Sequence, residues 1–261
     1  MSGKINIMKA KEIKINIKEK FKHLSKAPIV EAIIEFQTDF YEEWKTDAIK
    51  EFLIKQLPKY PIIKTEKKVT HKFIVGSPDE HNSNQVDWGF RLKSQDNLYI
   101  ARFNRDGFSC SHLEPYSNWG AFITEALRLW DIYYKLGKPS IINRLGIRVI
   151  DRISVPSEGL KLEDYIKQAP KPLNNLNLFL DGFLHQENFT LPNYPYGINV
   201  IRTIQPQADN KVDILLDIDV FTLKNFEINS EILNKYLTEM RWIKNKIFFN
   251  SITKKTLELF L

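Results

Sequence analysis

Cysteine occurs once in this sequence of 261 residues, as Cys110. One thiol excludes an internal disulfide framework and is typical of a protein in a reducing cytoplasm, which is the location we expect. Glycine is also scarce, with 10 residues, and the sequence contains no Walker loop, Rossmann glycine fingerprint or nucleophile elbow. The chain therefore lacks the usual means of building a loop that cradles phosphate.

Long hydrophobic runs are absent as well. No apolar segment approaches the roughly 20 residues that cross a bilayer, and the lysines near the start precede no continuous apolar segment of the kind found in secretory signals. His71, His81 and His185 have no metal-ligand spacing. We therefore expect no membrane contact, no zinc site and no cofactor.

The sequence does contain enough apolar material for a core, with 43% hydrophobic and 12% aromatic residues. Its formal net charge of +6 would favour polyanionic partners. Lysine recurs through residues 1–26, a basic N-terminal arm that we expect to be a solvated tail. Because the lysines are dispersed, weak and salt-sensitive association of this arm with nucleic acid is all that we predict.

The clearest predicted strand is Ile141–Pro156. Its apolar residues Leu145 and Ile147 alternate with polar positions that include Arg148 and Arg152, the period of a half-buried strand. Other strands are predicted at residues 27–37, 64–75, 86–94, 98–112, 179–191, 197–205 and 212–223. Helices are predicted at residues 44–57, 117–136, 162–168, 230–249 and 254–261, with Ser117 and Thr253 as N-caps.

These elements predict an α+β fold in which the order strand, helix, three strands, long helix occurs twice. The first pass covers residues 27–140 and the second covers residues 141–261. The two tandem β-α-β-β-β-α repeats would join through their leading strands into one curved antiparallel sheet, with both long helices on one face. This architecture is like that of the TATA-binding protein, although a fold alone does not imply DNA binding.

Candidate chemistry is concentrated on the polar faces of the strands. Asp217 and Asp219 lie on one side of the strand 212–223 and are spaced to bind a divalent cation. Pairing with arginines of neighbouring strands is the alternative that we favour. The candidate ligand-binding residues are Arg91, Arg102, Arg148, Arg152, Asp217 and Asp219. Arginines on a shared face suit phosphate or carboxylate, and a row of surface ion pairs is the alternative.

Cys110 and His112 share one face of a predicted strand, which permits a contact between thiolate and imidazole. A cysteine nucleophile also needs a base within hydrogen-bond reach and an oxyanion site, and no third orienting residue stands out. We therefore favour a buried free cysteine beside a surface histidine, and we assign no catalytic residue and no metal ligand.

Four segments, APIVEAIIEF, RLGIRVIDRISVP, LLDIDVF and FFNSIT, occur in this order along the chain. As an ordered set they resemble a sporadically distributed family of uncharacterised bacterial proteins of about this length, which open with a similar PIVEA strand. The resemblance implies no established activity or substrate. The patchy occurrence of the family associates it with mobile elements or antiviral defence systems.

The expected function is that of a non-catalytic binding or interaction module in the bacterial cytoplasm. Its expected partner is another protein or a second copy of the chain. An enzyme or sensor acting on a nucleotide or other phosphorylated small molecule, through the arginine and aspartate face, is the first alternative. A non-specific nucleic-acid binder is the second.

Overall fold

The computed structural model describes residues 13–72, 82–171, 178 and 180–261. The strands are β1 (Ile29–Thr38), β2 (Ile62–Lys72), β3 (Asn82–Lys93), β4 (Tyr99–Asn104), β5 (Gly107–Leu113), β6 (Ile141–Pro156), β7 (Leu184–Thr190), β8 (Tyr196–Gln207), β9 (Lys211–Thr222) and β10 (Phe226–Glu227). The helices are α1 (Thr46–Gln56), α2 (Trp119–Gly137), α3 (Ser230–Ser251), α4 (Lys254–Glu258) and the short 3-10 helix η1 (Leu162–Asp164). The predicted α+β class is confirmed. No helix among these residues is both long and apolar enough to cross a membrane.

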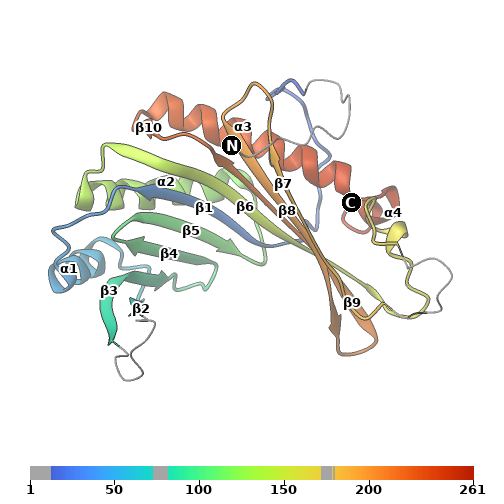
Figure 1. Cartoon of the computed structure of the whole chain (residues 1–261), viewed down its shortest axis with the longest axis horizontal. Helices are drawn as coiled ribbons and strands as arrows, with labels where there is room; N and C mark the ends of the chain where they lie inside the picture. Colours follow the sequence, from blue (N-terminus) through green and yellow to red (C-terminus); the bar gives the residue numbers. More distant parts are fainter. Residues whose placement is uncertain (1–12, 73–81, 172–177, 179) are drawn as a thin grey trace.

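Within the described residues, ten strands form one antiparallel sheet in the order β2-β3-β4-β5-β1-β6-β9-β8-β7, and β10 pairs with β6. The strands β1 and β6 meet at the centre of this order. They pair along most of their length, from Ile29 opposite Asp151 to Thr38 opposite Ile142. Strands from earlier and later parts of the chain therefore lie on either side of this central pair (Figure 1).

One face of the sheet carries the hydrophobic core. Ile34 of β1 lies opposite both Cys110 of β5 and Ile147 of β6, and Ile147 lies opposite Val220 of β9. All four side chains are buried. Because directly opposed residues of an antiparallel pair point to the same side of the sheet, these four residues define the core face.

Both long helices cover this core face (Figure 1). Phe36, which follows Ile34 on the same side of β1, stacks on Trp130 of α2 with ring centroids 4.2 Å apart. Tyr196, in the core-facing row of β8, donates a hydrogen bond to Glu239 of α3. We call the opposite side of the sheet the open face.

The prediction of one strand over residues 98–112 is wrong, because β4 and β5 form a hairpin there. Asn104 lies opposite Gly107 across a tight turn. Gly107 has a φ of 155°, and a Cβ at this position would lie 2.2 Å from the carbonyl oxygen of Phe36. Only glycine fits this conformation and close approach. Four strands therefore follow α1, where three were predicted.

Smaller corrections concern the ends of elements. The N-cap of α2 is Asn118, whose side chain accepts a hydrogen bond from the backbone N–H of Ala121 at 2.9 Å, and not Ser117. Residues 162–168 contain only the short η1 instead of an α-helix. The strand predicted over 179–191 begins at Leu184. Thr253 caps α4 as predicted. Residues 73–75, 81 and 179 lie outside the described part of the chain.

Residues 13–26 are not the solvated tail that the composition suggested. Glu19 accepts hydrogen bonds from Trp242 and Lys246 of α3, and Phe21 stacks on Phe249 with ring centroids 5.4 Å apart. The N-terminal arm therefore packs against α3 through these residues, while residues 1–12 lie outside the described part. This packing is hard to predict from the sequence, because the anchoring residues are isolated among lysines.

Candidate functional site

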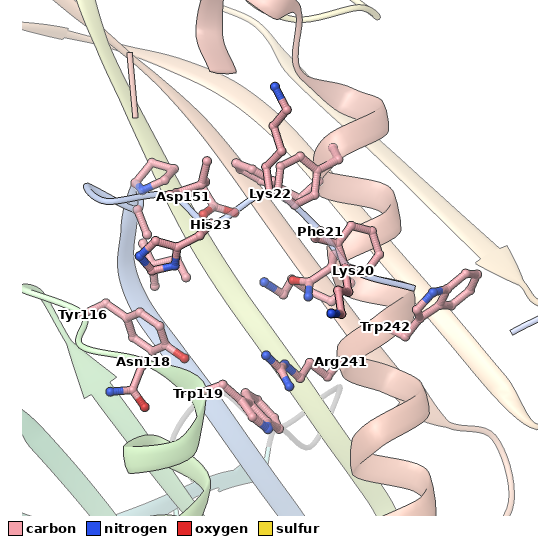
Figure 2. A pocket seen from close by; sticks show the side chains of 18 of the residues that line it. Lys20, Phe21, Lys22, His23, Tyr116, Asn118, Trp119, Asp151, Arg241 and Trp242 are labelled. Atoms are coloured by element: carbon pink, nitrogen blue, oxygen red, sulfur yellow. The ribbon is translucent and has the colours of Figure 1, made fainter. Parts of the chain in front are cut away.

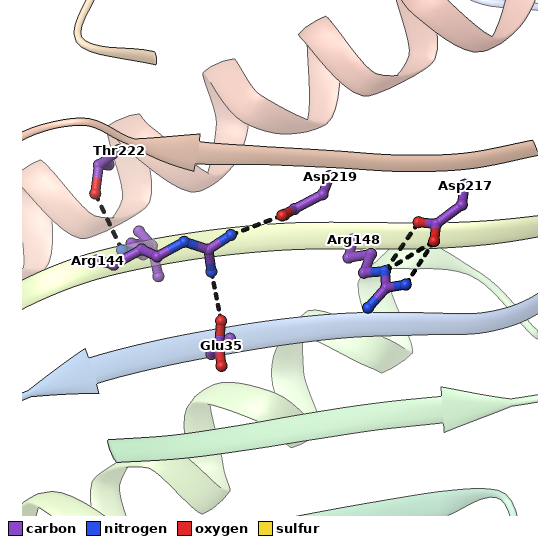
Figure 3. A network of polar contacts seen from close by, with 7 residues as sticks. Glu35, Arg144, Arg148, Asp217, Asp219 and Thr222 are labelled. Atoms are coloured by element: carbon purple, nitrogen blue, oxygen red, sulfur yellow. Dashed lines mark hydrogen bonds and ion pairs between the residues drawn. The ribbon is translucent and has the colours of Figure 1, made fainter. Parts of the chain in front are cut away.

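The open face carries the charged residues that were predicted on the central strands (Figure 3). Arg148 donates to Asp217 from Nε, 2.9 Å from Oδ1, and from Nη2, so the pair is bidentate. Asp219 instead accepts from Nη2 of Arg144 at 2.7 Å. Arg144 also donates to Glu35 of β1. Neither Arg144 nor Glu35 was predicted as a site residue, although Arg144 lies in the same strand as Arg148.

These contacts leave little free charge on the central part of the open face. Arg152 donates to Glu114 at 2.6 Å and lies 3.9 Å from Asp213. Burial raises the pKa of Asp219, and the neighbouring Arg144 opposes that effect. In the part of the chain that the structure describes, no group of three or more histidine, cysteine, aspartate or glutamate side chains could hold a metal ion. The cross-strand pairing favoured from the sequence is present.

Arg91 and Arg102 lie elsewhere on the open face. They face each other across β3 and β4, and Arg102 pairs with Glu66 of β2 at 3.3 Å. Two strands, β5 and β1, separate β4 from β6, so Arg102 is about 14 Å from the β6 arginines at the usual strand spacing. The six residues predicted as one site therefore form two separate groups.

The Arg148–Asp217 pair is expected to contribute only about 0.5–1 kcal/mol to the free energy of unfolding. The reason is exposure, since 46% of the Arg148 side chain is accessible to solvent. A double-mutant cycle with Arg148→Met and Asp217→Asn, measured by urea unfolding, gives the coupling energy. The coupling should shrink as salt is raised, and a value above about 2 kcal/mol, close to that of desolvated pairs, would contradict this account.

Cys110 and His112 both point into the core, so the expected surface position of His112 is wrong. His112 contacts the backbone oxygen of Leu113 at 2.7 Å through Nδ1 and the hydroxyl of Ser117 at 3.1 Å through Nε2. Burial raises the pKa of the Cys110 thiol well above its usual range. A neutral, fully buried thiol is a poor nucleophile, so this pair is structural.

A pocket lies on the core face, where the amino end of α2 approaches α3 (Figure 2). Its volume is about 520 Å³. Strand β6 supplies Asp151, and residues 17–24 of the arm line the pocket from a third side. The cationic residues of the lining are Lys20, Lys22, Arg241 and Lys244, and its aromatic residues are Phe21, Tyr116, Trp119, Trp242, Phe248 and Phe249.

Asp151 is the most unusual residue of this pocket. It follows Ile147 and Val149 in the core-facing row of β6 and is 1% exposed. Its Oδ2 atom is buried and has no hydrogen-bond partner within the described part of the chain. Burial raises the pKa of Asp151 to about 7. Buried carboxylates nearly always have partners, so this group requires an explanation.

Lys244 of α3 is the electrostatic neighbour of Asp151. It is 9% exposed, and burial lowers its pKa while the charge of Asp151 raises it. The two side chains attract each other, yet no ion pair or hydrogen bond joins them in the described residues. The pocket therefore contains a buried carboxylate oxygen without a partner in the described residues, and the neighbouring amine of Lys244 is not bonded to it.

Arg241 lies one helical turn before Lys244, on the same side of α3. Its guanidinium group stands over the ring of Trp119 at 5.3 Å from the centroid and points toward the segment that opens α2 (Figure 2). Burial lowers the pKa of Arg241. The positive end of the α2 dipole, at Asn118 and Trp119, faces the same space. The mouth of the pocket is therefore strongly cationic.

The arm segment that lines the pocket is attached to α3 through Glu19. Its carboxylate accepts from Trp242 Nε1 at 2.9 Å and from Lys246 Nζ at 2.7 Å. The hydrogen bond from Lys246 lowers the pKa of Glu19. This attachment neutralises Glu19, so the remaining charge of the lining stays positive.

Glu19→Gln is expected to loosen the arm without unfolding the sheet, because it weakens two charge-dependent contacts at a solvent-accessible position. Trypsin should cleave at Lys20 and Lys22 several times faster in this variant, while the urea midpoint of the core hardly changes. Glu42→Gln, at an exposed position before α1, is the matched control. Equal cleavage rates in the two variants would show that Glu19 does not hold the arm.

Comparison of the chain with protein-family models, with curated proteins and with solved structures gives no match in any of the three. The candidate site therefore depends on the geometry of this chain alone. The pocket was not predicted from the sequence, although two residues indicate it. Asp151 interrupts the apolar row of the central strand, and Lys244 follows Met240 of the buried side of α3 by four residues.

Proposed function

We propose that the protein is a non-catalytic binding module that holds a small organic anion in the pocket between α2, α3 and the arm. The observation that carries this proposal is the buried carboxylate of Asp151, which lacks a partner in the described chain and lines the same pocket as the buried amine of Lys244. Leaving buried polar groups unsatisfied is costly. A ligand that hydrogen-bonds to both groups removes that cost.

The charge of the lining supports an anionic ligand. Four lysine and arginine side chains line the pocket, and of its two carboxylates Glu19 is already paired with Lys246. The volume of about 520 Å³ falls within the range of about 300–1,000 Å³ typical of small-molecule sites. The lining supplies hydrogen-bond donors and aromatic rings, which favours binding over nucleophilic chemistry.

Thermal unfolding in the presence of organic phosphates and carboxylates tests this function. A ligand at 100 times its dissociation constant is expected to stabilise the folded state by about 2.7 kcal/mol, which raises the unfolding temperature by a few degrees. Arg241→Gln should abolish the shift. Lys254→Gln, on the exposed surface of α4, should keep it. A panel in which no anion raises the unfolding temperature of the wild-type chain would refute the proposal.

The arrangement of the two halves of the chain is part of the same proposal. We infer that residues 27–140 and 141–261 are tandem repeats arranged as in the TATA-binding protein. Support comes from the central pairing of β1 with β6 and from one long helix packed on each side of that pair. The pocket would then lie at the junction of the repeats. A cytoplasmic location, supported by the single cysteine, and a role in a mobile-element or defence system complete this proposal.

Self-association is a second candidate function. Strand β7 is the last strand of the sheet order in the described residues, and Leu184 and Phe189 on it are exposed, as are Leu178 and Leu180 before it. A second copy of the chain could extend the sheet at this edge. Sedimentation equilibrium should then detect a dimer that Leu184→Asp dissociates. A monomer at all concentrations would exclude this pairing.

A further inference from the structure

We propose that the anion is a guanine nucleoside monophosphate, whose base is bound by Asp151 and Lys244 and whose phosphate is bound by Arg241 at the amino end of α2. This inference rests on the proposed function and deepens it. It follows from three features of the lining, which are the polar residues Asp151 and Lys244, Arg241 beside the amino end of α2, and several aromatic side chains.

Asp151 and Lys244 together favour a ligand that presents hydrogen-bond donors and an acceptor side by side on one edge. Asp151 offers an unpaired carboxylate oxygen, and Lys244 offers ammonium hydrogens. Guanine presents N1–H and N2–H next to O6, so its donors suit the carboxylate and its acceptor suits the ammonium group. Adenine and uracil each present only one donor on the corresponding edge. Guanine therefore satisfies the pair best.

The same pair disfavours an amino acid as the ligand. In that case the ammonium group of the ligand would have to approach Asp151, while its carboxylate bound Arg241. Lys244 is close enough to Asp151 for its charge to affect the pKa of that carboxyl group, and it would repel a second cation there. The edge of guanine is neutral and carries donors, so Lys244 does not repel it.

The outer mouth suits phosphate. Arg241 offers the planar guanidinium group that binds phosphate oxygens in pairs. The amino end of α2, a helix of 19 residues, adds the positive end of its dipole at Asn118 and Trp119. Two independent sources of positive potential therefore meet at one place (Figure 2).

Aromatic side chains line the same pocket. Tyr116 and Trp119 line one side of the pocket, and Phe21 and Phe248 line others. Bases stack on such rings in sites that bind unpaired nucleotides. The volume of about 520 Å³ is far larger than a lone phosphate needs, whereas nucleotide-sized ligands commonly occupy pockets of this size.

Isothermal titration of the full chain with GMP, AMP, guanosine and inorganic phosphate tests the proposal. GMP should bind at least tenfold more tightly than AMP, guanosine or phosphate alone. Asp151→Asn should remove the preference for GMP over AMP. Arg241→Gln should reduce GMP to the affinity of guanosine, and Lys254→Gln should change nothing.

Lys244→Met provides a second test of base recognition if Asp151→Asn folds poorly, and circular dichroism checks the fold of every variant. Equal affinity for GMP and AMP would overturn the assignment of the base. Binding of aromatic carboxylates or other phosphates, without binding of GMP, would overturn the ligand class and leave the proposed function intact. Failure of every anion to bind would overturn both.

Discussion

Asp151→Asn is expected to make the protein more stable at pH 8 by about 1–3 kcal/mol and to leave its stability at pH 4 nearly unchanged. The folded chain holds the pKa of this carboxyl group at about 7 because of burial, against about 3.9 in an unfolded chain. Between these values the folded state keeps a proton that the unfolded state has released. Wild-type stability should therefore fall as the pH rises through this window.

Lys244 and Asp217 modify this effect. The charge of Lys244 lowers the pKa of Asp151, and Asp217 raises it. Removing the carboxylate deprives Lys244 of its counter-charge, and this offsets part of the gain in the free energy of unfolding. The expected gain is therefore below the value of about 4 kcal/mol that corresponds to the full pKa shift of Asp151.

Urea unfolding of both proteins at pH 4, 6, 7 and 8 measures the difference. Asp131→Asn, at an exposed position of α2, controls for the loss of one carboxylate. A variant less stable than the wild type at pH 8 would show instead that Asp151 and Lys244 stabilise the fold as an ion pair, and the case for an unsatisfied carboxylate would fail.

Phe36→Ala is expected to lower the free energy of unfolding by about 3–5 kcal/mol, as is typical of a buried aromatic residue. Phe36 is 0% exposed at the centre of the sheet. Its ring lies 4.2 Å from that of Trp130 and 6.0 Å from that of Phe108. The substitution leaves a cavity where α2 packs on the central strands.

Phe40→Ala is the matched control for this prediction. Phe40 is 46% exposed and contacts Trp88 at the periphery of the fold. Its loss should cost less than about 1 kcal/mol, in line with other surface substitutions. Comparable losses for the two variants would mean that the packing of α2 on the central strands contributes less than its burial implies.

The alternation of apolar residues predicted the faces of the central strands correctly. In β9, Ile214, Leu216 and Ile218 are buried on the core face, while Asp217 and Asp219 lie on the open face. The partners of these aspartates were harder to predict, because alternation fixes a face and not the register between strands. The register places Asp219 directly opposite Arg148. Arg148 nevertheless pairs with Asp217, its diagonal neighbour, and Asp219 pairs with Arg144, so the side-chain conformations decide the partners as well.

The turn between β4 and β5 was not predicted, for a different reason. Asp106 and Gly107 form a recognisable turn signal, but the flanking residues continue the same alternation and favour one long strand. In α3, Ile232 is 37% exposed, whereas Leu233, Leu237 and Lys244 are buried. A lysine on the buried side of a helix is not expected from hydrophobic periodicity alone.

The pocket depends on contacts that no local pattern contains. It requires β6, the opening of α2, the middle of α3 and residues 17–24 to meet in space. The period of the central strand already placed Asp151 on the apolar side, and a charged residue in that position was the available signal. Whether Asp151 marks a binding site depends on whether it has a hydrogen-bond partner, and only the folded structure shows this.

The most direct test of the binding site uses the five tryptophans of the chain as probes in a ¹⁵N-labelled protein titrated with GMP. Trp119 and Trp242 line the pocket, whereas Trp44, Trp88 and Trp130 do not. We predict that the indole N–H signals of Trp119 and Trp242 shift in a saturable manner and that the other three stay in place. Shifts confined to Trp44, Trp88 or Trp130, or no shift at all, would contradict it.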